Sequence, residues 1–437
     1  MIPRGPFALP LAGNLPWFLR DKVGFLTRSA AAYGDVVKLH MGEPTYLLTR
    51  AEDIQHVLVD NAVNYNKSWR LTSERGKRLS GRGLQTSAGA THLRQRRLLQ
   101  PEFHRRSIET FLPIVLDRTR RRLSGWNDGQ RLDLAAEMES LSLSTIIGVL
   151  FGPGHLDPAL EEALTVRRRY IEYVYGSLLP YPEAWPLPLV RRYRAAMRYI
   201  DAVIRREIRQ PSSPHGLAAR LAAIEHPDGS RMTEDQVRDE ILSLTSTGYE
   251  TVGEALAWTL YLLTRHPDVE ARVRAELLEV LGERTPSPEG LSRLTYGRQV
   301  LNESMRLYPP TWIFVRMALG KDTLPSGAPV EAGRKLYVSQ YVVHRHPRYF
   351  SEPDRFDPDR FTPQAIAARP RFSYFPFGGG PRLCIGEHFA VLEMQAVLSQ
   401  VLPAFRFELS GDAVTPRPTI TLRPNGGVPA VARRRAG

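Results

Sequence analysis

The chain has 437 residues, of which 42% are hydrophobic and 24% charged, a balance that excludes a largely disordered protein. The net charge is +13, but the basic residues are spread along the chain and interleaved with acids, so nucleic acid is not an expected partner. The single cysteine excludes intramolecular disulfides and a zinc site built from cysteines alone.

The N-terminal segment is rich in apolar residues but is interrupted by Pro3, Pro6, Pro10 and Pro16. No apolar run reaches the roughly 18 residues that a membrane-spanning helix requires, and no signal-peptide cleavage pattern follows. We therefore expect a cytoplasmic protein with no membrane span, although the removal of an anchor that preceded this sequence stays open.

The sequence predicts a mainly α protein with small β-sheets. Strands are indicated where apolar and polar residues alternate between turn residues, at 36–39, 46–49 and 335–342. The β-rich parts lie mainly within residues 30–60 and 311–380, helices dominate the chain between them, and another helix is expected at 387–401. Because no stretch resembles an interdomain linker, we expect a single domain over residues 1–437.

The clearest predicted helix begins at Thr233, which forms a capping box with Gln236. Apolar residues then continue through Leu263, and Pro267 ends the pattern. About thirty residues of nearly uninterrupted helix span roughly 45 Å, enough to cross a whole domain.

The segment 377–386 reads FGGGPRLCIG and contains the only cysteine. Its three consecutive glycines would let the backbone approach a flat, bulky ligand. Cys384 precedes a helix expected to begin near Glu387, whose positive end and free N–H groups stabilise a thiolate. A thiolate is the ligand that a haem iron needs to cleave an O–O bond, and Arg382 can reach a carboxylate such as a haem propionate.

This segment resembles the cytochrome P450 signature F-x-x-G-x-R-x-C-x-G at every fixed position: Phe377, Gly380, Arg382, Cys384 and Gly386. Chance agreement at all of them in a chain of this length is on the order of one in several thousand. The resemblance implies the cytochrome P450 fold, with heme b (iron protoporphyrin IX) between the long central helix and the cysteine loop. It implies Cys384 as the proximal iron ligand.

A helix predicted over 294–307 places Glu303 and Arg306 on one face. Followed by two prolines, the pair resembles the E-x-x-R motif of the family. The third member of that network would be an arginine in a P-x-R-F segment, either Arg355 or Arg360. The family usually carries it at the later position, which favours Arg360, and the network is expected to be structural.

Within the long helix, the segment from Thr247 to Thr251 interrupts the apolar pattern. Gly248 removes bulk, and the Thr251 hydroxyl can bond to the Thr247 carbonyl and open the helix locally, where Glu250 and Thr251 could relay protons. A bent helix with exposed polar residues is the structural alternative. The segment resembles the family's (A/G)-G-x-(D/E)-T motif, with Thr247 and Tyr249 as departures, and the retained acid–alcohol pair implies activation of O2 itself.

His92 and Arg96 lie one helical turn apart and resemble the family's H-x-x-x-R pair, which donates to a haem propionate. Arg316 resembles a further propionate partner. A mainly apolar substrate pocket is implied, with walls from the 70–90 loop and from a helix pair at 170–190. The part of the loop at 70–82 is basic and is expected to be solvated and mobile, although contact with a substrate carboxylate stays open. Its candidate lining residues are equally good core residues: Leu244, Trp312, Ile313, Phe314 and Ile420.

The sequence carries no flavin motif, and one cysteine cannot hold an iron–sulfur cluster. Electrons are therefore expected from a separate ferredoxin or flavodoxin with its reductase, and the protein is expected to be a monomer. The predicted reaction inserts one oxygen atom from O2 into a hydrophobic small molecule, such as a terpenoid, a macrolide or a fatty acid. Oxidative coupling, rearrangement or desaturation stays open, and a haem sensor without turnover is the alternative from another class.

Overall fold

The computed structural model describes residues 3–177, 185, 187–225, 229, 231–411 and 413–435, without the side chains at 69 and 70. The chain forms two compact units. The first comprises Met1–Arg70 and Thr295–Glu387, and the second comprises Leu71–Leu294 and His388–Gly437. The helix α4 (Trp69–Thr72) contains one of the boundaries.

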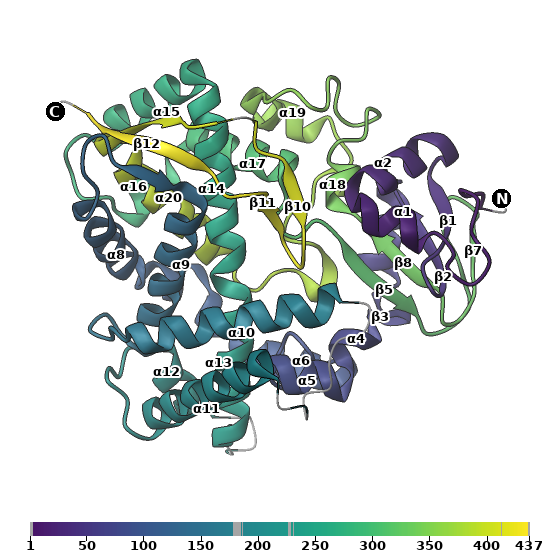
Figure 1. Ribbon diagram of the computed structural model, residues 1–437, viewed down its shortest axis with the longest axis horizontal. Coiled ribbons are helices and arrows are strands. Elements are labelled where there is room, and N and C mark those ends of the chain that lie inside the picture. Colours follow the sequence, from purple (N-terminus) through teal and green to yellow (C-terminus); the bar gives the residue numbers. More distant parts are fainter. Residues whose placement is uncertain are drawn as a thin grey trace. The chain divides into compact units, whose positions relative to one another are not determined.

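A five-stranded sheet in the order β1-β2-β8-β5-β3 organises the first unit (Figure 1). Its strands are β1 (Val36–His40), β2 (Pro44–Leu48), β8 (Lys335–Val338), β5 (Phe314–Ala318) and β3 (Tyr65–Lys67). Only the β2–β8 pair is parallel. Because alternate side chains point to opposite faces of a strand, Leu48, Leu336 and Val338 enter one apolar core, which also contains Ile54 and Phe372.

Short helices and turns surround this sheet within the first unit. They are α1 (Leu15–Arg20), α2 (Lys22–Tyr33), α3 (Ala51–Gln55), the π-helix η1 (His56–Asp60), η2 (Ala62–Asn64), α17 (Thr295–Leu307), α18 (Gln340–Val343), η4 (Pro358–Phe361), α19 (Pro363–Ala367), η5 (Arg371–Ser373) and η6 (Gly380–Arg382). A small hairpin joins β6 (Asp322–Thr323) to β7 (Pro329–Val330). The strand predicted at 335–342 is shorter than expected, because Ser339 caps α18 at its N-terminus.

The second unit is mainly helical. Its helices are α5 (Glu74–Ser80), α6 (Gly89–Leu99), η3 (Gln100–Phe103), α7 (Arg105–Glu109), α8 (Leu112–Ser124), α9 (Leu134–Phe151), α10 (Pro158–Gly176), α11 (Pro188–Arg209), α12 (Leu217–Ala223), α13 (Glu234–Gly248), α14 (Glu250–Arg265), α15 (Pro267–Val280), α16 (Pro288–Ser292) and α20 (Glu387–Ala404). Its sheets pair β4 (Arg131–Asp133), β12 (Pro429–Arg434) and β9 (Phe405–Leu409), and β10 (Pro416–Pro418) with β11 (Leu422–Pro424). The predicted fold class, mainly α with small β-sheets, is therefore confirmed.

The helix α9 is the one helix in the described residues that is long and apolar enough to cross a membrane by length and composition. It packs along α14, and most of it is buried within the protein (Figure 1). A Cβ atom on Gly253 of α14 would lie 2.8 Å from the Glu139 Cα, so glycine allows the two helices to approach closely. Core packing accounts for the apolar composition of α9.

The long helix predicted from Thr233 to Leu263 is present, and it is divided into two consecutive helices. The capping box of Thr233 and Gln236 opens α13 as predicted, but α13 ends at Gly248. Helix α14 begins at Glu250, and Tyr249 between the two helices stays in the right-handed helical region, with φ displaced to −103° and ψ of −42°. The two helices meet at the polar segment that the sequence singled out.

Candidate active site

Cys384 lies in a tight loop at the end of the first unit, just before α20 begins at Glu387. The Cys384 N–H donates to the Phe377 carbonyl over 2.9 Å, and the Leu383 N–H donates to the Gly380 carbonyl over 3.0 Å. The thiol is exposed. An exposed thiol before a helix N-terminus suits a thiolate that ligates iron, because the helix end stabilises its negative charge.

The glycines of this loop are required by packing inside the protein. Gly380 has a φ of +64°, and a Cβ atom there would lie 1.8 Å from the Leu58 carbonyl oxygen of η1. A Cβ atom on Gly379 would lie 2.6 Å from the Phe372 ring. Contacts with η1 and Phe372 thus require glycine at positions 379 and 380 within the protein itself, and the approach of a flat ligand stays a prediction.

Three cations lie close together in the first unit: Lys67, Arg316 and Arg382. Lys67 of β3 stands directly opposite Arg316 of β5 in the strand register. Burial, and then the charges of Arg382 and Arg316, lower the pKa of Lys67 to about 7. Burial lowers the pKa of Arg316 to about 10, and no carboxylate in the described residues pairs with it. Like charges directly opposite in a sheet are unfavourable, so this group fits a ligand that brings carboxylates, as the haem propionates do.

Lys67 is a candidate haem-binding residue that the sequence did not reveal. Nothing in the residues around it distinguishes it from any lysine in a short strand. Only the pairing of β3 with β5, which joins residues far apart in the sequence, brings it to Arg316.

Replacing Arg316 with leucine or Lys67 with methionine is expected to weaken haem retention. Each change removes a charged donor to a carboxylate, a contact that contributes about 1.5–3 kcal/mol. The haem-to-protein ratio after gel filtration, and the rate of haem transfer to an apo-acceptor protein, would measure the loss. Lys38→Met, at an exposed position of β1 in the same unit, is the matched control and should retain haem normally. Retention equal to that of the control in both variants would contradict the assignment.

Glu303 and Arg306 form a bidentate ion pair on α17, with N···O distances of 2.6 and 2.8 Å. Both side chains are fully buried. Arg360 lies 3.6 Å from the same carboxylate, while the Arg355 guanidinium pairs with Glu352 at the surface. The structure thus places Arg360, the favoured candidate, beside Glu303.

His344 connects this network to the start of the cysteine loop. Arg306 donates to the His344 carbonyl over 2.9 Å, and the Phe375 N–H donates to the His344 Nε2 over 3.0 Å. Burial holds the pKa of His344 well below its usual value, so the ring is neutral and can accept this bond. The ion pair therefore fixes the backbone from which the loop of Phe377 and Cys384 departs.

At the junction of α13 and α14, the Thr251 hydroxyl donates to the Thr247 carbonyl over 3.1 Å, as predicted. Gly248 faces α9, because a Cβ atom there would lie 3.1 Å from the Ile146 Cδ1. Burial raises the pKa of Glu250 to about 7, against the opposing effect of Arg423 and Arg168. An acid that gains and loses a proton near neutral pH thus directly precedes Thr251 in the chain.

The remaining predicted anchors and pocket residues lie in both units. His92 is buried and Arg96 half-buried on α6 of the second unit. Leu244 and Trp312 are buried, Ile313 and Phe314 are half-buried, and Ile420 is exposed. Phe314 packs against the core of the first unit and beneath the Arg316 guanidinium. Of the wall expected at 170–190, residues 178–184 and 186 lie outside the described residues.

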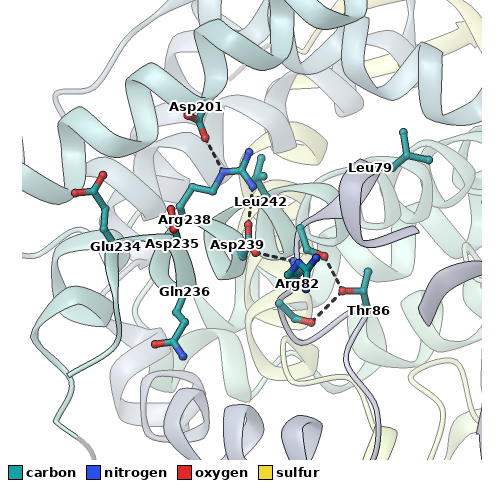
Figure 2. A network of polar contacts seen from close by, with 12 residues as sticks. Leu79, Arg82, Thr86, Asp201, Glu234, Asp235, Gln236, Arg238, Asp239 and Leu242 are labelled. Carbon is teal, nitrogen blue, oxygen red and sulfur yellow. Dashed lines mark hydrogen bonds and ion pairs between the residues drawn. The ribbon is translucent and has the colours of Figure 1, made fainter. Parts of the chain in front are cut away.

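The loop after α5 is tied to α13 by side chains of that helix (Figure 2). Asp239 accepts from the Arg82 N–H over 2.9 Å, and Glu240 accepts from the Leu84 N–H over 2.8 Å. Ser243 accepts from the Gln85 N–H over 3.1 Å. The expectation of a mobile basic loop is thus corrected, because Glu74–Ser80 is helical and the following residues are held by acceptors.

Sequence and structure comparisons identify the family. The cytochrome P450 family matches residues 3–428. The chain is 34% identical to cyclooctatin synthase of Streptomyces melanosporofaciens, over 95% of this chain and 92% of that protein. It is 33% identical to cyclooctat-9-en-7-ol 5-monooxygenase of the same organism, over 92% and 88% of the two chains. Pentalenene oxygenase of Streptomyces avermitilis is 30% identical, over 93% and 92%.

The solved structure of a cyanobacterial relative, CYP120A1 with retinoic acid bound, is similar with a TM-score of 0.88 and 25% identity over 99% of both chains. With an exposed thiolate candidate and a buried cationic group for carboxylates, the first unit has what a haem protein needs. The chain belongs to the cytochrome P450 family and is a haem-thiolate monooxygenase.

Proposed function

We propose that this enzyme inserts one oxygen atom from O2 into a polycyclic terpenoid. The observation that supports the substrate class is the names of three relatives, each 30–34% identical over more than nine-tenths of this chain: cyclooctatin synthase, cyclooctat-9-en-7-ol 5-monooxygenase and pentalenene oxygenase. Such substrates are almost wholly apolar. The pocket residues predicted from the sequence include Leu244, Ile313 and Phe314, whose aliphatic and aromatic side chains suit such a substrate.

The proposed cofactor is heme b, held by Cys384 and by the cations Arg316, Lys67 and Arg382. When bound, the haem supplies the iron centre at which dioxygen is reduced and cleaved. Thr251 and Glu250 hold and move the protons that this reaction consumes. The proposed electron donor is a ferredoxin or flavodoxin with its reductase, because the described residues contain no flavin motif and a single cysteine.

The substrate assignment is tested by titrating the purified holoprotein with pentalenene and with cyclooctat-9-en-7-ol. A linear fatty acid and a macrolide are the comparison compounds. A terpenoid should shift the Soret band at lower concentration than either comparison compound, and turnover with a surrogate ferredoxin, its reductase and NADPH should add one oxygen atom, labelled from ¹⁸O2.

Each alternative has its own outcome in that experiment. A shift with the fatty acid or macrolide alone would contradict the terpenoid assignment. A product that has lost two hydrogen atoms would indicate desaturation, and a dimeric product would indicate coupling. Binding without substrate-dependent consumption of NADPH would favour a sensor.

Thr251→Val is expected to lower product formation by roughly 10–100-fold, because valine keeps the shape of threonine but lacks the hydroxyl that moves protons. NADPH oxidation should continue and yield hydrogen peroxide instead, which a peroxidase-coupled assay measures. Thr264→Val is the matched control, because Thr264 makes the same kind of bond, to the Leu260 carbonyl over 2.8 Å, elsewhere on α14. Equal product yields from the two variants would contradict the role of Thr251.

A further inference from the structure

A second acid, Glu254, lies on α14 one helical turn after Glu250. Residues at this spacing lie on the same helix face, with Cβ atoms about 5–6 Å apart. The Glu254 side chain is only 6% exposed, and its Oε1 accepts from the Thr421 hydroxyl over 2.7 Å. Its Oε2 is buried and has no hydrogen-bond partner among the described residues. One oxygen of this buried carboxyl group thus makes no hydrogen bond within the described residues.

Glu254 belongs to a cluster of charges contributed by α9, α10, α14 and β11. Arg423 lies 2.8 Å from Glu254, 3.0 Å from Glu139 and 3.4 Å from Glu172. Arg168 lies 2.9 Å from both Glu139 and Glu172. The position of Arg423 is fixed by its neighbour Leu422, whose carbonyl accepts from the Trp258 indole of α14 over 2.9 Å.

The cluster holds more acids than bases. The positive charge of Arg167 on α10 also interacts electrostatically with Glu250. The Arg167 guanidinium donates hydrogen bonds to the Ser246 hydroxyl and to the Leu79 carbonyl. The phenol of Tyr249 is neutral, because burial raises its pKa. Four carboxylates therefore face three guanidinium groups: Glu139, Glu172, Glu250 and Glu254 against Arg167, Arg168 and Arg423. Because an unbalanced buried charge is costly, one proton is expected to be retained and shared within the cluster.

That proton belongs to the two acids of α14. Burial raises the pKa of Glu254 to about 8 and that of Glu250 to about 7. The side chains of Glu139 and Glu172 are 21% and 23% exposed, so the outer end of the cluster reaches solvent. The acids thus extend from the surface to the junction of α13 and α14, and the two innermost have similar proton affinities, which favours transfer between them.

We propose that Glu254 is a positioning residue that resupplies Glu250 with protons during turnover, a role that rests on the proposed activation of O2. In each transfer, the O–H bond of the Glu254 carboxyl breaks and an O–H bond forms on the Glu250 carboxylate, directly or through one water. Glu254 then takes a proton from solvent water at the end of the cluster where Glu139 and Glu172 lie. No electrons change hands in these steps.

The test measures reduction of O2 by the holoprotein with NADPH, a surrogate ferredoxin and its reductase, without an organic substrate. The wild-type rate should fall as the pH rises through about 8, because Glu254 loses its proton there. Glu254→Gln should lower the rate at pH 7 by about tenfold and remove the fall near pH 8, because the amide cannot relay a proton. Glu254→Asp, which keeps the acid with a shorter reach, should lower the rate but retain the fall at alkaline pH.

Glu393→Gln is the matched control. Glu393 is a buried glutamate on α20 in the same unit, bonded to the Ser142 hydroxyl over 2.9 Å and outside this cluster. Its variant should keep the wild-type rate and pH profile. The spectrum of the carbon monoxide complex of the reduced protein checks the fold of each variant. If Glu254→Gln does not fold, the pH profile of the Glu254→Asp variant tests the relay instead.

A folded Glu254→Gln variant with the wild-type rate and pH profile would overturn the relay. A Glu254→Asp variant that has lost the fall at alkaline pH would overturn it as well. Since the assay contains no terpenoid, an error in the substrate class leaves the result unaffected. A wild-type holoprotein that reduces no O2 would instead overturn the proposed oxygen activation, and the relay with it.

Discussion

Replacing Cys384 with serine is expected to lower turnover by more than about 100-fold. Mutation of a residue that only hydrogen-bonds to a metal ligand typically lowers activity by about 10–100-fold, and loss of the ligand itself should have a larger effect. The serine hydroxyl does not ionise near neutral pH, so the negative sulfur that donates electron density to iron is lost. The absorption spectrum of the reduced carbon monoxide complex should lose the Soret band of thiolate-ligated iron.

Ile385→Val, in the same loop, is the control and should keep both the spectrum and the activity. Serine is close in size to cysteine, so the Cys384 N–H bond to the Phe377 carbonyl can persist. The variant should therefore fold. An unchanged spectrum together with unchanged turnover would contradict the assignment of Cys384 as the iron ligand.

Glu303→Gln is expected to lower the free energy of unfolding by about 3–5 kcal/mol, because it leaves the Arg306 charge buried without its partner. Both side chains are fully buried, so water cannot compensate. Chemical denaturation and thermal unfolding of the holoprotein would measure the loss. Because Arg306 also holds the His344 carbonyl, retention of haem should fall as well.

Glu352→Gln is the matched control for this change. Glu352 also pairs with an arginine three residues away, Arg355, at 3.2 Å, but the two side chains are 71% and 64% exposed. Loss of such a surface pair should cost less than about 1 kcal/mol. Equal stability of the Glu303→Gln and Glu352→Gln variants would contradict the structural role of the buried pair.

The sequence alone was sufficient for features set by local spacing. The loop around Cys384, the helix that follows it and the pairing of Glu303 with Arg306 each depend on residues within about a dozen positions of one another. Their geometry follows from the turn, cap and helix periodicity in that short segment. The bond from Thr251 to the Thr247 carbonyl was predictable for the same reason.

The tertiary structure decided what depends on residues brought together from distant segments. Lys67 reaches Arg316 only through the register of β3 on β5, and Glu254 reaches Arg423 only because β11 packs against α14. The interruption at Tyr249 and the contacts that require Gly379 and Gly380 likewise depend on neighbouring elements. Strand register and packing are settled by the summed burial of many side chains, so no local pattern at these residues encodes them.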